Sequence, residues 1–260
     1  MRVVRLVHEG IEHWASLEDD ATARLWTAAP YLGFGKTDLL VPARNLICPV
    51  TPSKIVCVGR NYAAHAKELG NEVPKEPLLF LKPPSSLVGP DASIELPPES
   101  ARVEYEGELC IVVGRPLRRV TSDEAMAGIF GATVANDVTA RDLQKKDVQF
   151  TRGKGFDTFC PVGPWIETDS LDFANLTLTT RVNGETKQHG FTSNMVFHVG
   201  VLLAYISQTM TLLPGDIVLT GTPEGVGPLV SGDVVEVEVS GVGVLRNVVR
   251  GSTHGGVPPL

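Results

Sequence analysis

The sequence predicts an α+β protein that is dominated by β-structure, with few short helices and a small β-rich segment at its N-terminus. Apolar and polar residues alternate, or apolar residues form short runs, in many segments, whereas helical spacing extends over only one longer segment. The 26 glycines and 19 prolines follow no repeating period and indicate many tight turns. With 260 residues, 43% of them hydrophobic, the chain can bury a large core without crosslinks.

The first 50 residues predict a small N-terminal domain, and residues 51–260 a second, larger domain. Apolar and polar residues alternate from Val3 to Leu6, which indicates a strand. A turn that contains glycine and a short acidic stretch follow this strand. Pro49 and Pro52 mark the boundary between the two domains.

A buried strand and a short helix are expected directly after this boundary. The apolar segment KIVCVG predicts a strand over residues 54–59, and AAHAKEL predicts a helix over residues 63–69. Asn61 can act as the N-cap of this helix, and Gly70 ends it. The proline-rich connection over residues 74–98 predicts a long loop with one strand at its apolar run LLFL.

The rest of the chain contains most of the expected strands. Residues 104–113 alternate and then become fully apolar, which is typical of a strand that runs from a cleft into the core. The pair Asn183-Gly184 predicts a tight hairpin turn after a strand over residues 176–182. The other predicted strands cover residues 131–135, 216–220, 234–239 and 244–249.

Two further helices are predicted. The segment Thr121–Glu124 has the pattern of a capping box, so a short helix is expected from there to about Gly128. Apolar residues from Met195 to Gln208 recur at helical spacing, which predicts an amphipathic helix packed on the core.

Composition excludes several classes of function. The formal net charge of −7 argues against a nucleic-acid-binding surface. No apolar stretch is long enough to cross a membrane, and the N-terminus lacks the apolar core of a signal peptide, so we expect a cytoplasmic protein. The four cysteines form no CxxC pair and are expected to be small buried thiols; they are Cys48, Cys57, Cys110 and Cys160.

Carboxylates form the most informative pattern in the chain. Glu104, Glu106 and Glu108 alternate along one predicted strand, so all three would point to the same face. Asp137 follows another apolar strand and would enter a cleft at its end. Oxygen ligands without His or Cys suit a hard cation such as Mg²⁺ or Mn²⁺. Alternatively, the glutamates are solvated acids on an edge strand and Asp137 belongs to a turn.

Two other segments carry candidate catalytic groups. His65 and Glu68 are three residues apart on the predicted helix, where the carboxylate could fix the imidazole tautomer for general base catalysis. A satisfied structural histidine is the alternative. Lys154 lies between two glycines, so a ligand can approach it closely. The glycine-rich segment 221–227 follows a strand but matches neither a phosphate-binding loop nor a dinucleotide fingerprint, and it is either a plain turn or a ligand-binding loop.

Six ordered motifs together resemble the fumarylacetoacetate hydrolase family, over about residues 52–250. They are VGRNYAAHAKE (58–68), LLFLKP (78–83), YEGELCIVVG (105–114), ANDVTARDLQ (135–144), RGKGFDTFCPVGPW (152–165) and LTGTPEGVG (219–227). The resemblance implies a mixed β-roll, a homodimer and a divalent metal held by three carboxylates. The length is similar to that of members described as acylpyruvate hydrolases or 2-hydroxyhepta-2,4-diene-1,7-dioate isomerases.

The resemblance also assigns roles to individual residues. It implies metal ligation by Glu106, Glu108 and Asp137, and so sets Glu104 aside. His65 and Glu68 correspond to a pair that activates water, and Lys154 to a lysine that stabilises an oxyanion. The positions expected to contact substrate are Arg141, Gln144 and Thr222.

The implied activity is metal-dependent chemistry on a 2-oxo or β-diketo acid through a metal-bound enolate. Hydrolysis of a carbon–carbon bond in an acylpyruvate is expected first, because a complete His65–Glu68 pair makes most sense where water must be activated. Isomerisation of 2-hydroxyhepta-2,4-diene-1,7-dioate and decarboxylation of an oxaloacetate-type acid are the alternatives, since both use the same enolate. A non-catalytic carboxylate-binding protein is the alternative outside enzymes.

Overall fold

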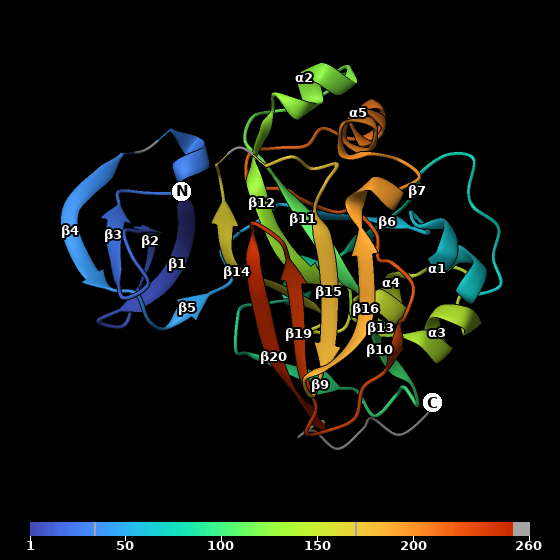
Figure 1. The fold of residues 1–260 in the computed structure, drawn as a ribbon. Coiled ribbons are helices and arrows are strands. Elements are labelled where there is room, and N and C mark those ends of the chain that lie inside the picture. Colours follow the sequence, from blue (N-terminus) through green and yellow to red (C-terminus); the bar gives the residue numbers. More distant parts are fainter. Residues whose placement is uncertain (34, 170, 252–260) are drawn as a thin grey trace.

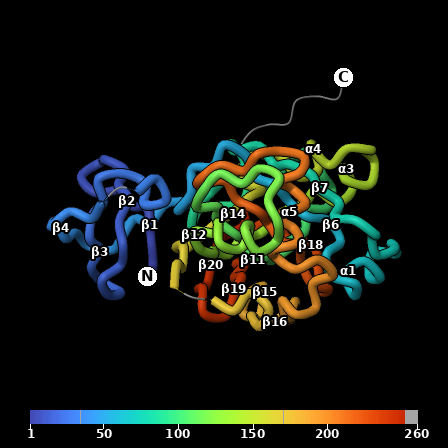
Figure 2. Tube along the Cα trace, turned by 90° about the horizontal axis from the view of Figure 1, so that it is seen from above, coloured from blue at the N-terminus to red at the C-terminus, as the bar shows by residue number. Residues whose placement is uncertain are grey.

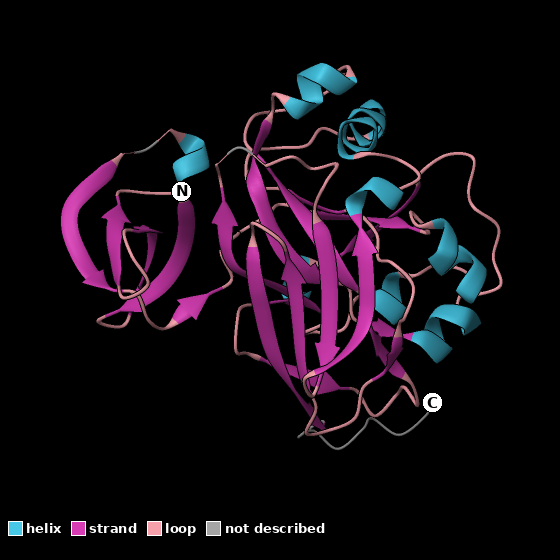
Figure 3. Ribbon diagram, viewed as in Figure 1, coloured by secondary structure: helices cyan, strands magenta, loops and turns pink. Residues whose placement is uncertain are grey.

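The computed structural model describes residues 1–33, 35–169 and 171–251. Strands account for 44% of the structure and helices for 16%, so the predicted β-dominated fold is confirmed (Figures 1 and 3). The strands are β1 (Arg2–His8), β2 (Ile11–Leu17), β3 (Thr22–Trp26), β4 (Lys36–Pro42), β5 (Leu46–Ile47), β6 (Ile55–Gly59), β7 (Leu78–Lys82), β8 (Leu87–Val88), β9 (Ser93–Leu96), β10 (Val103–Tyr105), β11 (Gly107–Val113), β12 (Ile129–Asn136), β13 (Thr139–Ala140), β14 (Cys160–Glu167), β15 (Thr177–Val182), β16 (Glu185–Phe191), β17 (Ile217–Leu219), β18 (Gly227–Pro228), β19 (Val234–Val239) and β20 (Gly243–Gly251). The helices are α1 (Ala63–Glu68), α2 (Ser122–Met126), α3 (Arg141–Lys146), α4 (Thr151–Lys154) and α5 (Val199–Thr209).

Two large sheets enclose the main core. The first has the order β4-β3-β2-β1-β14-β12-β11-β17-β6-β7, and the second has the order β16-β15-β19-β20-β9. On the central strand β11, Leu109 and Ile111 belong to the core shared with the second sheet. Cys110 and Val112 belong to another core on the opposite face. Because both faces of β11 are buried, the strand is apolar beyond its first two residues.

The N-terminal strands lie to one side of this body (Figures 1 and 2). Strands β1 to β4 form an antiparallel ladder over a small core of their own, made of Val4, Leu6, Ala15, Ala23, Leu25 and Val41. Strand β1 also pairs with β14, through Arg2 opposite Glu167 and Val3 opposite Ile166. The N-terminal segment therefore continues the first sheet, while the domain boundary near residue 50 stays a prediction.

Asn61 is not the N-cap that the sequence predicts. Tyr62 precedes α1 and makes no capping hydrogen bond with its side chain. The buried amide of Asn61 instead donates to the carbonyls of Phe197 and Thr220, at 3.0 and 2.8 Å, and its oxygen accepts from the Phe197 N–H. These contacts keep the segment before α5 extended, which is why α5 begins at Val199 rather than at Met195.

Several local predictions are confirmed. Thr121 and Glu124 form a complete capping box at the start of α2. Asn183 and Gly184 have φ angles of 53° and 80°, as a tight hairpin turn between β15 and β16 requires. The cysteines are free thiols and are buried, except for Cys48, which is partly exposed. Within the described ranges, no helix combines the length and hydropathy that a membrane span needs.

Candidate active site

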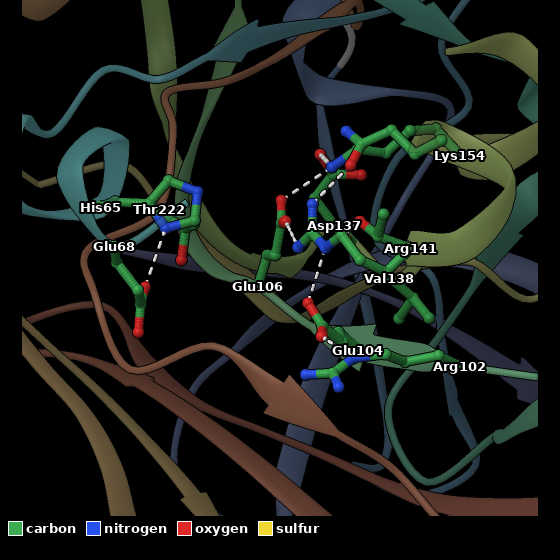
Figure 4. A network of polar contacts seen from close by, with 12 residues as sticks. His65, Glu68, Arg102, Glu104, Glu106, Asp137, Val138, Arg141, Lys154 and Thr222 are labelled. Atoms are coloured by element: carbon green, nitrogen blue, oxygen red, sulfur yellow. Dashed lines mark hydrogen bonds and ion pairs between the residues drawn. The ribbon is translucent and has the colours of Figure 1, made fainter. Parts of the chain in front are cut away.

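A cavity of about 230 Å³ opens beside α1, α3 and α4. All the predicted site residues line it except Glu68, and these are His65, Glu106, Glu108, Asp137, Arg141, Gln144, Lys154 and Thr222. Glu68 lies next to His65 and contacts its imidazole ring (Figure 4). Segments from six parts of the sequence therefore meet at one place, with apolar walls from Leu78, Phe80 and Phe150.

Three carboxylates converge at the inner end of the cavity. Glu108 lies on β11, and Asp137 follows β12, the strand that pairs with β11. Glu106 lies between β10 and β11, where its N–H bonds to the Asn136 side chain and its carbonyl accepts from the Asp137 N–H, at 2.9 and 2.8 Å. One oxygen from each carboxylate lies within 4.8 Å of the others, and all three side chains are buried.

The predicted continuous strand over residues 104–113 is wrong. It breaks at Glu106, so that β10 joins a small sheet with β13 and β18 while β11 joins the first large sheet. Glu104 therefore does not share a face with Glu106 and Glu108 as its spacing predicts. Its carboxylate binds Arg141 and Arg102 instead (Figure 4).

Buried lysines compensate the carboxylates. The Lys154 Nζ lies 2.7 Å from Glu106 and 2.6 Å from Asp137. Burial alone lowers the pKa of Lys154, but Asp137 and Glu106 outweigh burial and raise it to about 12. Lys82 also donates to Asp137 at 2.6 Å, and its side chain is fully buried. At neutral pH the Lys154 side chain is thus a fixed ammonium group.

The surroundings of Glu106 favour its charged form, whereas those of Glu108 favour its neutral form. Burial acts against the charge of Glu106, but Lys154 and Arg141 hold its pKa below the usual range. Burial, together with Asp137 and Glu106, raises the pKa of Glu108 well above the usual range, although the Gly221 N–H donates to it at 2.6 Å. A cation among the three carboxylates would relieve this repulsion. An oxygen-only set of donors fits a hard divalent ion such as Mg²⁺ or Mn²⁺.

His65 and Glu68 form a pair on the opposite side of the cavity from Lys154 (Figure 4). The His65 Nδ1 lies 3.3 Å from a Glu68 oxygen, and the imidazole is buried. The Gly225 N–H donates to both Glu68 oxygens, at 3.0 and 3.2 Å. Glu68 therefore connects α1 to the glycine-rich loop after β17 and leaves the His65 Nε2 to face the cavity.

The predicted substrate contacts lie in a dense network of hydrogen bonds. Arg141 donates from Nε to Glu104 at 2.6 Å, from Nη1 to Gln144 and from Nη2 to Glu106. The Thr222 hydroxyl donates to the Gly107 carbonyl and accepts from Gln188, both at 2.8 Å. Thr222 thus fixes the loop after β17 against β11, and its hydroxyl hydrogen is engaged in the bond to the Gly107 carbonyl.

A family model described as fumarylacetoacetate (FAA) hydrolase C-terminal matches residues 54–250. The chain belongs to the fumarylacetoacetate hydrolase family. Protein Rv2993c of Mycobacterium tuberculosis is 51% identical over 207 residues, 79% of this chain and 78% of that protein. The human mitochondrial oxaloacetate tautomerase FAHD2A is 47% identical over 217 residues, 79% of this chain and 69% of that protein.

Solved structures extend the match to the N-terminal strands. The 2-hydroxyhepta-2,4-diene-1,7-dioate isomerase from Mycobacterium marinum is 45% identical, with a TM-score of 0.90 over 98% of this chain and 100% of that one. A 5-carboxymethyl-2-hydroxymuconate delta-isomerase from Mycobacterium smegmatis is 43% identical, with a TM-score of 0.91 over 97% of this chain and 100% of that one. The chain is thus an enzyme of the fumarylacetoacetate hydrolase family, whose members include hydrolases, isomerases and tautomerases.

In this fumarylacetoacetate hydrolase family protein, two polar residues that hold the site in place are not identified by the sequence patterns. Lys82 ends the apolar run LLFLK, and a lysine directly after such a run was the available signal. Gln188 accepts from the Gly107 N–H at 3.0 Å and donates to Thr222, so it supports the strand break beside Glu106. Nothing in the alternating pattern of β16 distinguishes Gln188 from an ordinary edge residue.

Proposed function

We propose that this chain is a divalent-metal-dependent enzyme that interconverts the keto and enol forms of a small 2-oxo dicarboxylic acid such as oxaloacetate. One observation carries the proposal: three buried carboxylates and the Lys154 ammonium face His65 across one cavity. The names of the relatives support it, because a tautomerase and two isomerases are 43–47% identical to this chain. Tautomers and isomers differ by the position of a proton and a double bond, which acid and base groups on opposite sides of a substrate can move.

Glu106, Glu108 and Asp137 would hold the cation. When bound, it would supply positive charge to the carboxylate and the adjacent oxygen of a 2-oxo acid. Lys154 has three N–H bonds, two of which point to Glu106 and Asp137. The third can donate to the substrate oxygen on which enolate charge develops. The His65 Nε2 can then remove the proton from the carbon next to the ketone, or return it, while Glu68 stabilises the imidazolium.

The mouth of the cavity supports a dicarboxylic substrate. Arg60 and Lys145 line the cavity together with the apolar side chains of Leu78 and Phe150. Arg60 is partly exposed and Lys145 is exposed, so they lie toward the solvent, whereas the three carboxylates are buried. A substrate with one carboxylate at the inner end would bring its second carboxylate toward these two cations. This arrangement favours a dicarboxylate over a 2-oxo acid with an apolar tail.

The His65–Glu68 pair also favours a second candidate, hydrolysis of the carbon–carbon bond of an acylpyruvate. The His65 Nε2 would take a proton from water, and the resulting hydroxide would attack the distal carbonyl. The bond to the pyruvate methylene carbon then breaks, the enolate that leaves takes the proton back from the His65 imidazolium, and the products are a carboxylic acid and pyruvate. From the sequence, hydrolysis is expected first and tautomerisation is not among the alternatives, whereas the names of the relatives support tautomerisation. Hydrolysis stays a prediction, as do the homodimer and the cytoplasmic location.

A panel of substrates tests these proposals. Oxaloacetate tautomerisation is followed by the absorbance of the enol, and pyruvate release is measured from oxaloacetate and from acylpyruvates that include fumarylpyruvate. Each assay contains Mg²⁺, Mn²⁺ or excess EDTA. Loss of enol absorbance that is metal-dependent and without pyruvate release supports the tautomerase. Release from acylpyruvates would establish the hydrolase instead, and rapid release from oxaloacetate a decarboxylase. A protein that binds Mg²⁺ but turns over none of these compounds would contradict the proposal.

A further inference from the structure

Glu104 is a buried carboxylate that takes no part in the chemistry proposed above. It lies on β10, its residue is 2% exposed, and it does not line the main cavity. One oxygen accepts from the Arg141 Nε at 2.6 Å, and the other accepts from the Arg102 Nε. We propose that Glu104 is a positioning residue that fixes the Arg141 guanidinium through its Nε, so that the terminal nitrogens, one of which donates to Glu106, are oriented to bind the carboxylate of the substrate.

The geometry of Arg141 shows what Glu104 contributes. A guanidinium has five N–H donors, and three of them point to Glu104, Gln144 and Glu106. Glu104 takes the Nε hydrogen, so the terminal nitrogens retain hydrogens for a ligand in the cavity that Arg141 lines. Two parallel hydrogen bonds from an arginine to a carboxylate give both energy and orientation.

Glu106 and the substrate carboxylate would compete for the N–H groups of Arg141, which is why a separate partner at Nε is needed. Glu106 contacts both Arg141 and Lys154, and it is also one of the three proposed metal ligands. Without the charge of Glu104, Glu106 would be the only carboxylate in contact with the Arg141 guanidinium. Arg141 already donates to Glu106 from Nη2, and without a carboxylate at Nε the guanidinium would be able to rotate and place both terminal nitrogens on Glu106, which would leave fewer N–H groups for the substrate.

A purely structural role for Glu104 accounts less well for these contacts. The Arg102 side chain is 56% exposed, so water can solvate its charge without a buried partner. The Arg141 side chain is 4% exposed and needs buried partners, but one carboxylate would already neutralise it. A second buried carboxylate at this position carries a desolvation cost that neutralisation alone does not require.

A double-mutant cycle tests the proposal. The variants are Glu104→Gln, Arg141→Gln and the double variant, with Asp142→Asn as the matched control. Asp142 lies next to Arg141 on α3, and its carboxylate accepts from Ser100 and Ala101 rather than from the arginine. Loss of the Asp142 carboxylate therefore tests a general effect on α3. Circular dichroism and thermal melting compare the folding of all variants.

The main readout is calorimetric binding of oxalate with saturating Mg²⁺, because its two adjacent carboxylates resemble the enolate of a 2-oxo acid. We expect Glu104→Gln to weaken oxalate binding about tenfold, which corresponds to roughly 1.4 kcal/mol. Asp142→Asn should leave binding within about twofold. In the Arg141→Gln background, Glu104→Gln should have no further effect, because Glu104 acts through Arg141. In turnover, KM should rise about tenfold while kcat changes much less.

The proposal is overturned if Glu104→Gln binds oxalate as the wild type does, or if its effect persists undiminished when Arg141 is already replaced. A fall in kcat with KM unchanged would also overturn it. The inference rests on the proposed 2-oxo acid ligand, but oxalate binding is measured without turnover. If oxalate binds and no compound of the panel reacts, the proposed reaction fails while the cycle still decides on Glu104. Failure of the wild type to bind oxalate would overturn the role of Glu104 as well.

Discussion

Replacement of His65 by glutamine tests the proposed acid–base chemistry most directly. His65 is 4% exposed, lines the cavity, and is held by Glu68 through a 3.3 Å contact at Nδ1. Glutamine fills a similar space but cannot accept a proton at neutral pH. A well-placed general base contributes about 10² to 10⁴ in rate. Because His65 is both buried and oriented, we expect kcat to fall about 10³-fold, equivalent to roughly 4 kcal/mol.

Glu68→Gln provides a graded comparison for the same prediction. The amide can still bond to His65 and to the Gly225 N–H, so the orientation of the ring is retained and only the charge is lost. A hydrogen bond to a charged group contributes about 1 to 1.5 kcal/mol more than a hydrogen bond to a neutral group, so the loss of the Glu68 charge should lower kcat roughly tenfold. The variant at position 68 should therefore be far more active than the variant at position 65.

The assay follows the enol absorbance of oxaloacetate after subtraction of the rate without enzyme. Calorimetric Mn²⁺ binding is the control, since neither residue is a proposed ligand and both variants should bind the ion normally. A His65→Gln protein with normal Mn²⁺ binding and more than a tenth of the wild-type kcat would refute the role of His65 as base. In the acylpyruvate assay, the same variant should lose hydrolysis to a greater extent than oxaloacetate decarboxylation, because only hydrolysis needs an activated water.

Three other predictions concern the metal, the substrate and stability. Glu106→Gln should abolish metal-dependent activity with the fold retained, and near-normal turnover at saturating Mg²⁺ would contradict ligation. Alanine at Arg60 or Lys145 should raise KM about tenfold for a dicarboxylate, but not for a monocarboxylic acylpyruvate; equal effects on both would exclude charge recognition. Burial opposes the charge of Asp216, but hydrogen bonds from Lys54 and from backbone amides hold its pKa below the ordinary 3.8. Asp216→Asn should lose about 3 kcal/mol of unfolding free energy above pH 5, and urea titrations should show this difference shrinking as the pH falls below 3.8.

The sequence predicts those parts of the fold that local patterns determine. The Asn183-Gly184 turn, the capping box of α2 and the apolar strand β11 all depend on neighbouring residues, and all are present. The break at Glu106 depends instead on side chains far along the chain. Asn136 and Gln188 take the amide hydrogens of residues 106 and 107, so the strand cannot continue in one sheet. The alternation of side chains between the two faces of a strand cannot reveal such a break, because the residues that cause it lie far away in the sequence.

The candidate site, like the fold, can be predicted from the sequence only where it depends on neighbouring residues or on a motif. Motif resemblance brought together residues that line one cavity, whereas the alternating pattern alone grouped Glu104 with Glu106 and Glu108. The difference between these glutamates comes from tertiary contacts, because Glu104 lies against Arg141 on another element. Lys82 was missed for a similar reason, since only the pairing of β7 with β6 brings its ammonium group to Asp137.

The charges of the site would allow this acidic protein to bind the acidic substrates proposed above. Glu104, Glu106, Glu108 and Asp137 face three buried cations, Lys82, Lys154 and Arg141, which leaves one excess negative charge when all are ionised. A divalent ion among the carboxylates changes this to one excess positive charge. The inner end of the cavity would then attract a carboxylate. Binding of the metal before the substrate follows from this balance, and Glu104 keeps one of the three cations available to the carboxylate that arrives second.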